Sequence, residues 1–228
     1  MEKRHKNALT RTFRLGTSCV RLVLIASLFI PAAFSFKYLL QKGQAPESAR
    51  VVELVEKPRP QELVKIYSIV RSNRPDIGDV EAWRISEVIL QESSRHGLDP
   101  MLVLALIDVE SKFQYAAVSP AGARGIMQIL PGVAEGLVNE IGLSQPFGAQ
   151  RFRPEFLDNP ILNIKLGVYY LKDLKKSFRT TNLALTAYNL GPTETRNRLE
   201  NDGELSDDYT SAVLSTYQKY KQSKEPTF

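Results

Sequence analysis

Glu110 is the residue whose type and position best fit a chemical role, because it closes a mostly apolar stretch, residues 102–109. A carboxyl group at the end of an apolar helix is either buried at an energetic cost or lines a cleft, and a cleft is the simpler interpretation. Burial against Leu106, Ile107 and Met127 would disfavour the ionised form and raise the pKa, as a general acid near neutral pH requires. Position alone does not decide, since a glutamate at a helix end is more often structural.

A second segment, residues 119–131, reads SPAGARGIMQILP and could bring backbone close to a ligand. Gly122 and Gly125 permit tight turns there, and Gln128 offers an amide that can bind sugar hydroxyls. Taken by itself, Gln128 is more often a surface residue. The segment therefore gains weight only in combination with Glu110.

A third segment places Tyr188 and Asn189 at the end of a predicted helix, directly before a glycine and a proline. A phenol can hydrogen-bond a carboxyl group, although a tyrosine at such a place is more often part of the core. The evidence for a functional site is the joint occurrence of Glu110, Gln128 and Tyr188, since each alone is more often structural.

Few other chemistries are open, because the chain has one cysteine, Cys19, and two histidines, His5 and His96. Zinc sites of the Cys/His type and Cys–His nucleophiles are excluded from the body of the chain, and a serine nucleophile would have only His96. His96 precedes Gly97 and fits a helix C-terminal position better than a catalytic role. No ligand cluster or phosphate-binding glycine loop is evident, so no metal or organic cofactor is implied.

Helical patterns surround these segments. Apolar residues recur at helical spacing in residues 60–72 and 80–96. Asp99 as N-cap and Pro100 in the first turn predict the start of the helix that carries Glu110. Further helices are predicted at residues 159–177, 181–189 and 207–221. Nothing alternates in the manner of a strand, so the predicted fold class is all-α.

The N-terminal residues, 1–40, combine a basic stretch with an apolar run, Leu22 to Phe36, and predict export. The run is short for a spanning helix, which needs about 20 residues, and Ala33 and Ser35 form a small-x-small cleavage pattern. If Lys37 snorkels, the apolar stretch extends over residues 22–40 and could anchor the protein in the inner membrane. A cleaved signal and a retained anchor are both open.

Residues 41–60 contain prolines and charges and are predicted to be a linker, so the folded domain is expected at residues 61–228. The net charge of +5 comes from the N-terminus, because residues 1–21 hold six of the 30 basic residues and one of the 25 acidic ones. The remaining chain is balanced and gives no indication of a nucleic-acid partner.

Four blocks in order resemble the soluble-type lytic transglycosylases, which share a goose-lysozyme-like catalytic fold and cleave peptidoglycan. They are ALIDVESKF with Glu110 and Ser111, GIMQ at 125–128, NIKLGVYYL at 163–171 and ALTAYNLGP at 184–192. Together they span somewhat over a third of the chain. Each block alone would be a weak match, but four in the family's order are specific.

The resemblance implies that Glu110 is the sole acid and base. It would protonate the glycosidic oxygen between N-acetylmuramic acid and N-acetylglucosamine, and then take the proton from the muramic C6 hydroxyl, which closes a 1,6-anhydro ring without water. Tyr188 would hold the carboxyl group of Glu110. The residues that would shape or contact the sugar subsites are Ser111, Met127, Gln128 and Asn189.

Asp108, the acid nearest to Glu110 in sequence, lies two residues away and about 200° around the helix, so it is expected to be solvated or ion-paired. The chain departs from the family pattern elsewhere. Leu190 and Thr193 replace small residues, and Leu205 stands where a glutamate usually precedes the tyrosine helix that Tyr209 fits.

Two alternatives are open. A hydrolytic muramidase on the same fold would need a second acid, for which Glu135, Glu140 and Glu204 are candidates. A non-catalytic peptidoglycan-binding envelope module would use the cleft without turnover. The loop at residues 143–155, a cleft lid or a solvated connection, is unassigned. In each case we expect a monomeric domain in the cell envelope, on the periplasmic side, with peptidoglycan glycan strands as its partner.

Overall fold

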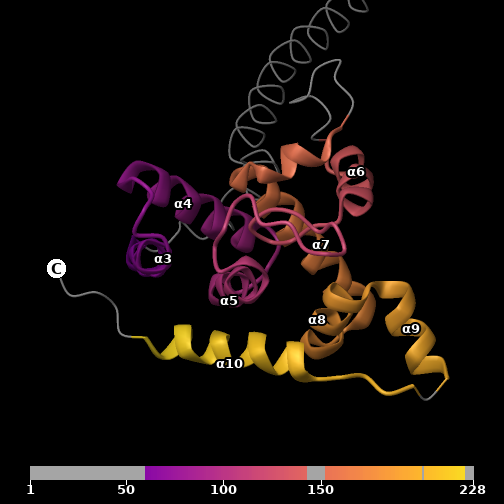
Figure 1. Ribbon diagram of the computed structural model, residues 1–228. Helices are drawn as coiled ribbons and strands as arrows, with labels where there is room; N and C mark the ends of the chain where they lie inside the picture. Colours follow the sequence, from indigo (N-terminus) through magenta and orange to yellow (C-terminus); the bar gives the residue numbers. More distant parts are fainter. Residues whose placement is uncertain (1–59, 143–151, 202, 224–228) are drawn as a thin grey trace, which may run out of the picture. The chain divides into compact units, whose positions relative to one another are not determined.

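The computed structural model describes residues 60–142, 152–201 and 203–223 (Figure 1). The signal or anchor predicted at residues 1–40, nearly all of the predicted linker and most of the 143–155 loop lie outside the described residues. Within the described ranges the regular secondary structure is helical, and the all-α class is confirmed. None of the described helices is long and apolar enough to cross a membrane.

The helices follow the chain in this order: α3 (Pro60–Asn73), α4 (Asp79–Arg95), α5 (Pro100–Ser111), α6 (Pro131–Glu140), the 3-10 helix η2 (Pro154–Asp158), α7 (Pro160–Phe178), α8 (Thr181–Leu190), α9 (Pro192–Glu200) and α10 (Asp208–Gln222). Every helix predicted from the sequence is present, with ends that differ by no more than about two residues. Three elements were not predicted: α6, η2 and α9. Of α9 only Thr195 is buried, so its sequence carries no apolar stripe to detect.

Helix α5 is the core element. The Asp99 carboxylate caps it by accepting a hydrogen bond from the backbone N–H of Met101 at 2.8 Å, and Pro100 occupies the first turn. All side chains from Pro100 to Ile107 are buried. A helix that is apolar on every side must be surrounded by other elements, and α3, α4 and α10 contact it.

The other helices extend from this core in pairs. Helix α4 packs against α3 and α7, and α7 packs in turn against α6, η2 and α8. Helix α10 runs past α5 and also contacts α8, as Figure 1 shows in yellow below them. A hydrogen bond between the buried hydroxyls of Thr186 and Thr210 at 3.3 Å joins α8 to α10. Helices from both ends of the described domain, α3 and α10, therefore contact α5.

The turn at residues 124–129 is held on α7 by Asn163, whose side chain is fully buried. Its amide nitrogen donates to the carbonyls of Arg124 at 2.9 Å and Leu157 at 3.0 Å, and its amide oxygen accepts from the backbone N–H of Met127 at 2.7 Å. Gly125 has a φ of 84°, and a Cβ there would overlap the Asn163 amide and the Leu157 carbonyl. Only glycine fits so close to this amide.

We predict that Asn163→Ala lowers the free energy of unfolding by about 2–4 kcal/mol, because the Leu157 carbonyl and the Met127 N–H lose their buried partner, while the Arg124 carbonyl keeps only its bond from the N–H of Ile129. Urea unfolding followed by circular dichroism measures the change. The control is Asn139→Ala, since Asn139 is exposed and makes one local hydrogen bond to the carbonyl of Glu135. Equal stability of the two variants would show that Asn163 does not hold the turn.

Candidate active site

Glu110 lies in the last turn of α5, and its side chain is half-buried. The Tyr209 hydroxyl, from the first turn of α10, donates a hydrogen bond to its Oε1. Burial raises the pKa of Glu110 to about 7, and the hydrogen bond from Tyr209 acts in the opposite direction. A carboxyl group with this pKa is partly protonated at neutral pH, so it can give a proton and also accept one.

Tyr188 is buried at the end of α8, and its hydroxyl donates to the carbonyl of Met127 at 2.9 Å. Burial and the negative charge of Glu110 both raise the pKa of Tyr188, so its phenol also lies in the field of that carboxylate. The prediction that Tyr188 holds the Glu110 carboxyl group is wrong, because its single donor goes to a backbone carbonyl and Tyr209 takes the expected place.

Two other predicted site residues have internal partners. The Ser111 hydroxyl contacts the carbonyls of Ile126 at 2.7 Å and Ile107 at 3.3 Å, so it joins α5 to the 124–129 turn. The Met127 side chain is fully buried, and a Cβ on Gly167 would lie 2.5 Å from its sulfur. Both residues pack beneath the site, and neither offers it an unbonded polar group.

Gln128 and Asn189 are more accessible. The Gln128 amide nitrogen donates to the carbonyls of Ala117 and Gly125, both at 2.9 Å, and so uses both N–H groups. What Gln128 can still offer a sugar is its amide oxygen, an acceptor. Asn189 is exposed in the last turn of α8 and follows Tyr188 directly.

The acids considered as neighbours or second carboxylates, Asp108 and Glu140, bind other residues. Asp108 forms an ion pair with Lys112 at 3.0 Å and accepts a hydrogen bond from Tyr220 at 2.8 Å, which confirms that it is ion-paired. The Glu140 carboxylate accepts a hydrogen bond from Tyr169 at 2.7 Å. Among the described residues, no second carboxylate contributes to the pKa shift of Glu110.

His96 occupies the C-cap of α4, as predicted, and its Nε2 lies 3.6 Å from the buried carboxylate of Glu92. Burial lowers its pKa. In the described part of the chain, His, Cys, Asp and Glu side chains form no group of three or more that could hold a metal ion.

The residue that sequence reasoning did not assign to the site is Tyr209. Three tyrosines of α10 donate to three carboxylates of the α5 segment: Tyr209 to Glu110, Tyr217 to Asp99 at 2.9 Å and Tyr220 to Asp108 at 2.8 Å. The recurrence of tyrosine along α10 was an available signal. The spacing of the tyrosines alone does not determine which carboxylate each phenol contacts, because that pairing depends on how α10 crosses α5.

Comparison with known proteins agrees with this arrangement. A family model described as the transglycosylase SLT domain matches residues 87–211, which is more than half of the chain. The chain belongs to this family. The match begins inside α4 and ends in the first turns of α10, so it includes both Glu110 and Tyr209.

Curated relatives carry the name membrane-bound lytic murein transglycosylase C. The protein from Glaesserella parasuis is 28% identical over 188 residues, covering 77% of this chain and 50% of its own. That from Photorhabdus laumondii is 34% identical over 136 residues, covering 55% and 36%. The chain thus spans about half the length, or less, of these relatives.

Solved structures share the fold. An inactive variant of the lytic transglycosylase Slt from Pseudomonas aeruginosa has a TM-score of 0.50 at 29% identity, covering 60% of this chain and 24% of its own. The 70 kDa soluble lytic transglycosylase from Escherichia coli has a TM-score of 0.52 at 23% identity, covering 72% and 30%. Both are several times longer than the matched region, so the likeness concerns one domain.

The pKa of Glu110 predicts a pH-dependent stability. Between its ordinary value of 4.5 and about 7 the unfolded chain has released the proton while the folded protein keeps it, so stability falls as pH rises. Glu110→Gln removes this cost. We expect the variant to exceed the wild type by at most about 3 kcal/mol at pH 8, and to match it at pH 4.

Urea unfolding of both proteins at the two pH values measures the difference. Glu135→Gln serves as control because Glu135 is exposed on α6, and we expect it to change stability little at either pH. A gain from Glu110→Gln that is the same at pH 4 and pH 8 would contradict a buried, protonated Glu110.

Proposed function

We propose that the chain is a peptidoglycan lytic transglycosylase. It cleaves the β-1,4 bond between N-acetylmuramic acid and N-acetylglucosamine and leaves a 1,6-anhydro-muramic end. The observation that carries this proposal is the half-buried Glu110, whose pKa of about 7 suits one group for both proton transfers. Membership in the SLT family and the names of the relatives support it.

In the first step, protonated Glu110 donates its proton to the glycosidic oxygen as the bond to the muramic C1 breaks. Glu110 is then a carboxylate, and the hydrogen bond from Tyr209 stabilises that charge. In the second step, the carboxylate takes the proton of the muramic C6 hydroxyl, and the oxygen of that hydroxyl attacks C1. The ring closes, Glu110 is protonated again, and no water is consumed.

The surroundings of Glu110 support internal ring closure over hydrolysis. A hydrolytic muramidase with two carboxylates needs a second one to position water or to form a covalent intermediate. Of the three candidates, Glu140 is bonded to Tyr169, and Glu135 and Glu204 are exposed. Among the described residues, no second carboxylate is a cause of the raised pKa of Glu110.

The roles of the remaining site residues follow from their contacts. We assign Tyr209 to positioning the carboxyl group and Tyr188 to fixing the Met127 carbonyl behind it. The amide oxygen of Gln128 and the exposed Asn189 are the groups that would meet the sugars, with Ser111 and Met127 as their support.

Location and organisation are part of the same proposal. We infer a monomeric catalytic domain at residues 61–228, joined through residues 41–60 to an export segment at 1–40 that is either cleaved or retained as an anchor at 22–40. The relatives are named membrane-bound, which favours the cell envelope. Protein fractionation of cells that express the full chain would locate it.

We predict that Glu110→Gln abolishes turnover of purified sacculi and keeps binding to them, because the amide preserves shape but cannot carry a proton. Mass spectrometry of the digest should show anhydromuropeptides with the wild type and none with the variant. Asp108→Asn is the matched control on the same helix, because that acid is paired with Lys112, and it should keep the activity.

Two outcomes would contradict the proposal. Products with reducing ends would identify a muramidase, and binding without any product from the wild type would identify a non-catalytic envelope module. Substantial activity of Glu110→Gln would remove Glu110 from the mechanism altogether.

Tyr209→Phe tests the positioning role. Loss of the hydrogen bond raises the pKa of Glu110 further, so the fall of kcat/KM on the alkaline side should move to higher pH. We also expect a rate loss of about tenfold or more at the optimum, since the carboxyl group is less well held. A pH–rate profile measures both.

The matched control is Tyr217→Phe on the same helix, whose hydroxyl donates to Asp99 at 2.9 Å. It should leave the alkaline limb where it is in the wild type. An unshifted limb in Tyr209→Phe would mean that the phenol does not tune Glu110.

A further inference from the structure

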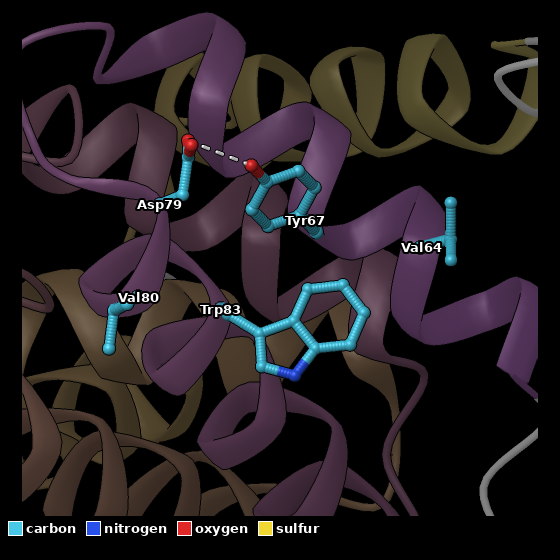
Figure 2. Close-up of a pocket in the computed structure, with 5 residues that line it drawn as sticks. All are labelled: Val64, Tyr67, Asp79, Val80 and Trp83. Atoms are coloured by element: carbon cyan, nitrogen blue, oxygen red, sulfur yellow. Dashed lines mark hydrogen bonds between the residues drawn. The ribbon is translucent and has the colours of Figure 1, made fainter. Parts of the chain in front are cut away.

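A second surface feature lies away from Glu110, between α3 and α4. It is an open groove of about 440 Å³, lined by Val64, Tyr67, Asp79, Val80 and Trp83 (Figure 2). Its volume is within the range of roughly 300–1,000 Å³ that is typical of small-ligand sites. Its lining shares no residue with the site around Glu110, which α5, α8, α10 and the 124–129 turn build.

An aromatic pair forms the wall of the groove. The rings of Tyr67 and Trp83 lie 5.3 Å apart between centroids and are tilted by 56°. Trp83 is 38% exposed and Val80 is 85% exposed, and both line the same groove, so they form a joint exposed apolar surface. Such rings offer flat apolar faces on which a ligand with a flat apolar face can stack.

Two carboxylates border the aromatic pair, and the rings themselves orient them. The Tyr67 hydroxyl donates to Asp79 Oδ1 at 3.0 Å, as the dashed line in Figure 2 marks, and Trp83 Nε1 donates to Glu87 Oε1 at 3.2 Å. Each carboxylate has a second oxygen that can accept further hydrogen bonds. The groove therefore combines aromatic stacking faces with carboxylate acceptors, and it fits a ligand that has hydrogen-bond donors.

The charge at the groove argues against an anionic ligand. Arg71, a cation beside the groove, is paired with Asp79 at 3.0 Å and donates to the carbonyl of Ile77 at 2.8 Å. The three charged side chains that bond to one another or to the aromatic pair, Arg71, Asp79 and Glu87, sum to one negative charge. Phosphate head groups of an anionic membrane would be repelled.

We propose that this groove is a second carbohydrate site that binds an uncharged pyranose, of the N-acetylglucosamine type, in a glycan strand. The C–H face of such a ring stacks on Trp83, and its hydroxyl and amide N–H groups donate to Asp79 and Glu87. This inference rests on the proposed function, since it concerns the same polymer. Its role would be to hold the strand while Glu110 acts at another position.

Trp83 is the only tryptophan of the chain, so its fluorescence reports on this groove alone. The test titrates an oligomer of N-acetylglucosamine into the full chain carrying Glu110→Gln, which cannot turn over. We expect a saturable change of the Trp83 emission. No change up to millimolar oligomer would overturn the proposal, and so would a response to anionic phospholipid vesicles in place of the oligomer.

A binding assay separates this site from catalysis. Trp83→Ala, and Val80→Asp as a second variant that touches no core residue, should weaken co-sedimentation with sacculi by about five- to tenfold. Both should cleave a short soluble glycan fragment, too short to span two sites, at the wild-type rate. Leu199→Ala is the control, because Leu199 is 46% exposed on α9.

Retention of both variants equal to that of the control would overturn the proposal. A loss of cleavage on the short fragment would do so too, because it would make the groove part of the first site. Failure of the proposed function is seen independently, as the absence of anhydro products from the wild type.

Discussion

The burial of one carboxyl group at the end of α5 is the constraint around which the domain is built. A helix with every side chain from Pro100 to Ile107 in the core needs neighbours on all sides, and one of them, α10, also supplies the Tyr209 that contacts Glu110. Desolvation then raises the pKa of Glu110 to about 7. The stability that the core supplies and the stability that an ionised Glu110 removes therefore arise from the same packing.

Helix α10 converts this burial into a usable site. Its phenols reach Asp99, Asp108 and Glu110, but the first two carboxylates also have lysine partners, Lys221 at 3.1 Å and Lys112 at 3.0 Å. The Lys221–Asp99 pair joins α10 to the start of α5, whereas the Lys112–Asp108 pair lies within the α5 segment. Glu110 has no such cation among the described residues, so Tyr209 moderates its pKa without neutralising its charge. The three acids thus differ in whether a lysine also binds the carboxylate that the tyrosine contacts.

Local patterns in the sequence were sufficient for most of the fold. Apolar spacing and the Asp99–Pro100 start predicted the buried helix and its end at Glu110, because such signals act within a few turns. Helix α9 escaped because its nine residues bury only Thr195. Tyr188 was given the wrong partner for another reason. Both Tyr188 and Tyr209 can donate to an acid, and only the crossing of α10 over α5 and the turn held by Asn163 decide which one does.

The turn at residues 124–129 explains why several side chains that were expected to contact the substrate or Glu110 bind the protein backbone in the structure. Ser111, Asn163, Tyr188 and the amide nitrogen of Gln128 all bind backbone groups of this turn or of its immediate neighbours. Several polar residues of the four family-like sequence blocks therefore bind the backbone of the turn and are not free to bind substrate. A turn fixed by so many buried bonds cannot shift without breaking several of them, which keeps the wall of the site in one place. The proton chemistry is left to Glu110 and Tyr209, whose bond strengthens when the carboxylate is charged and weakens when it is protonated.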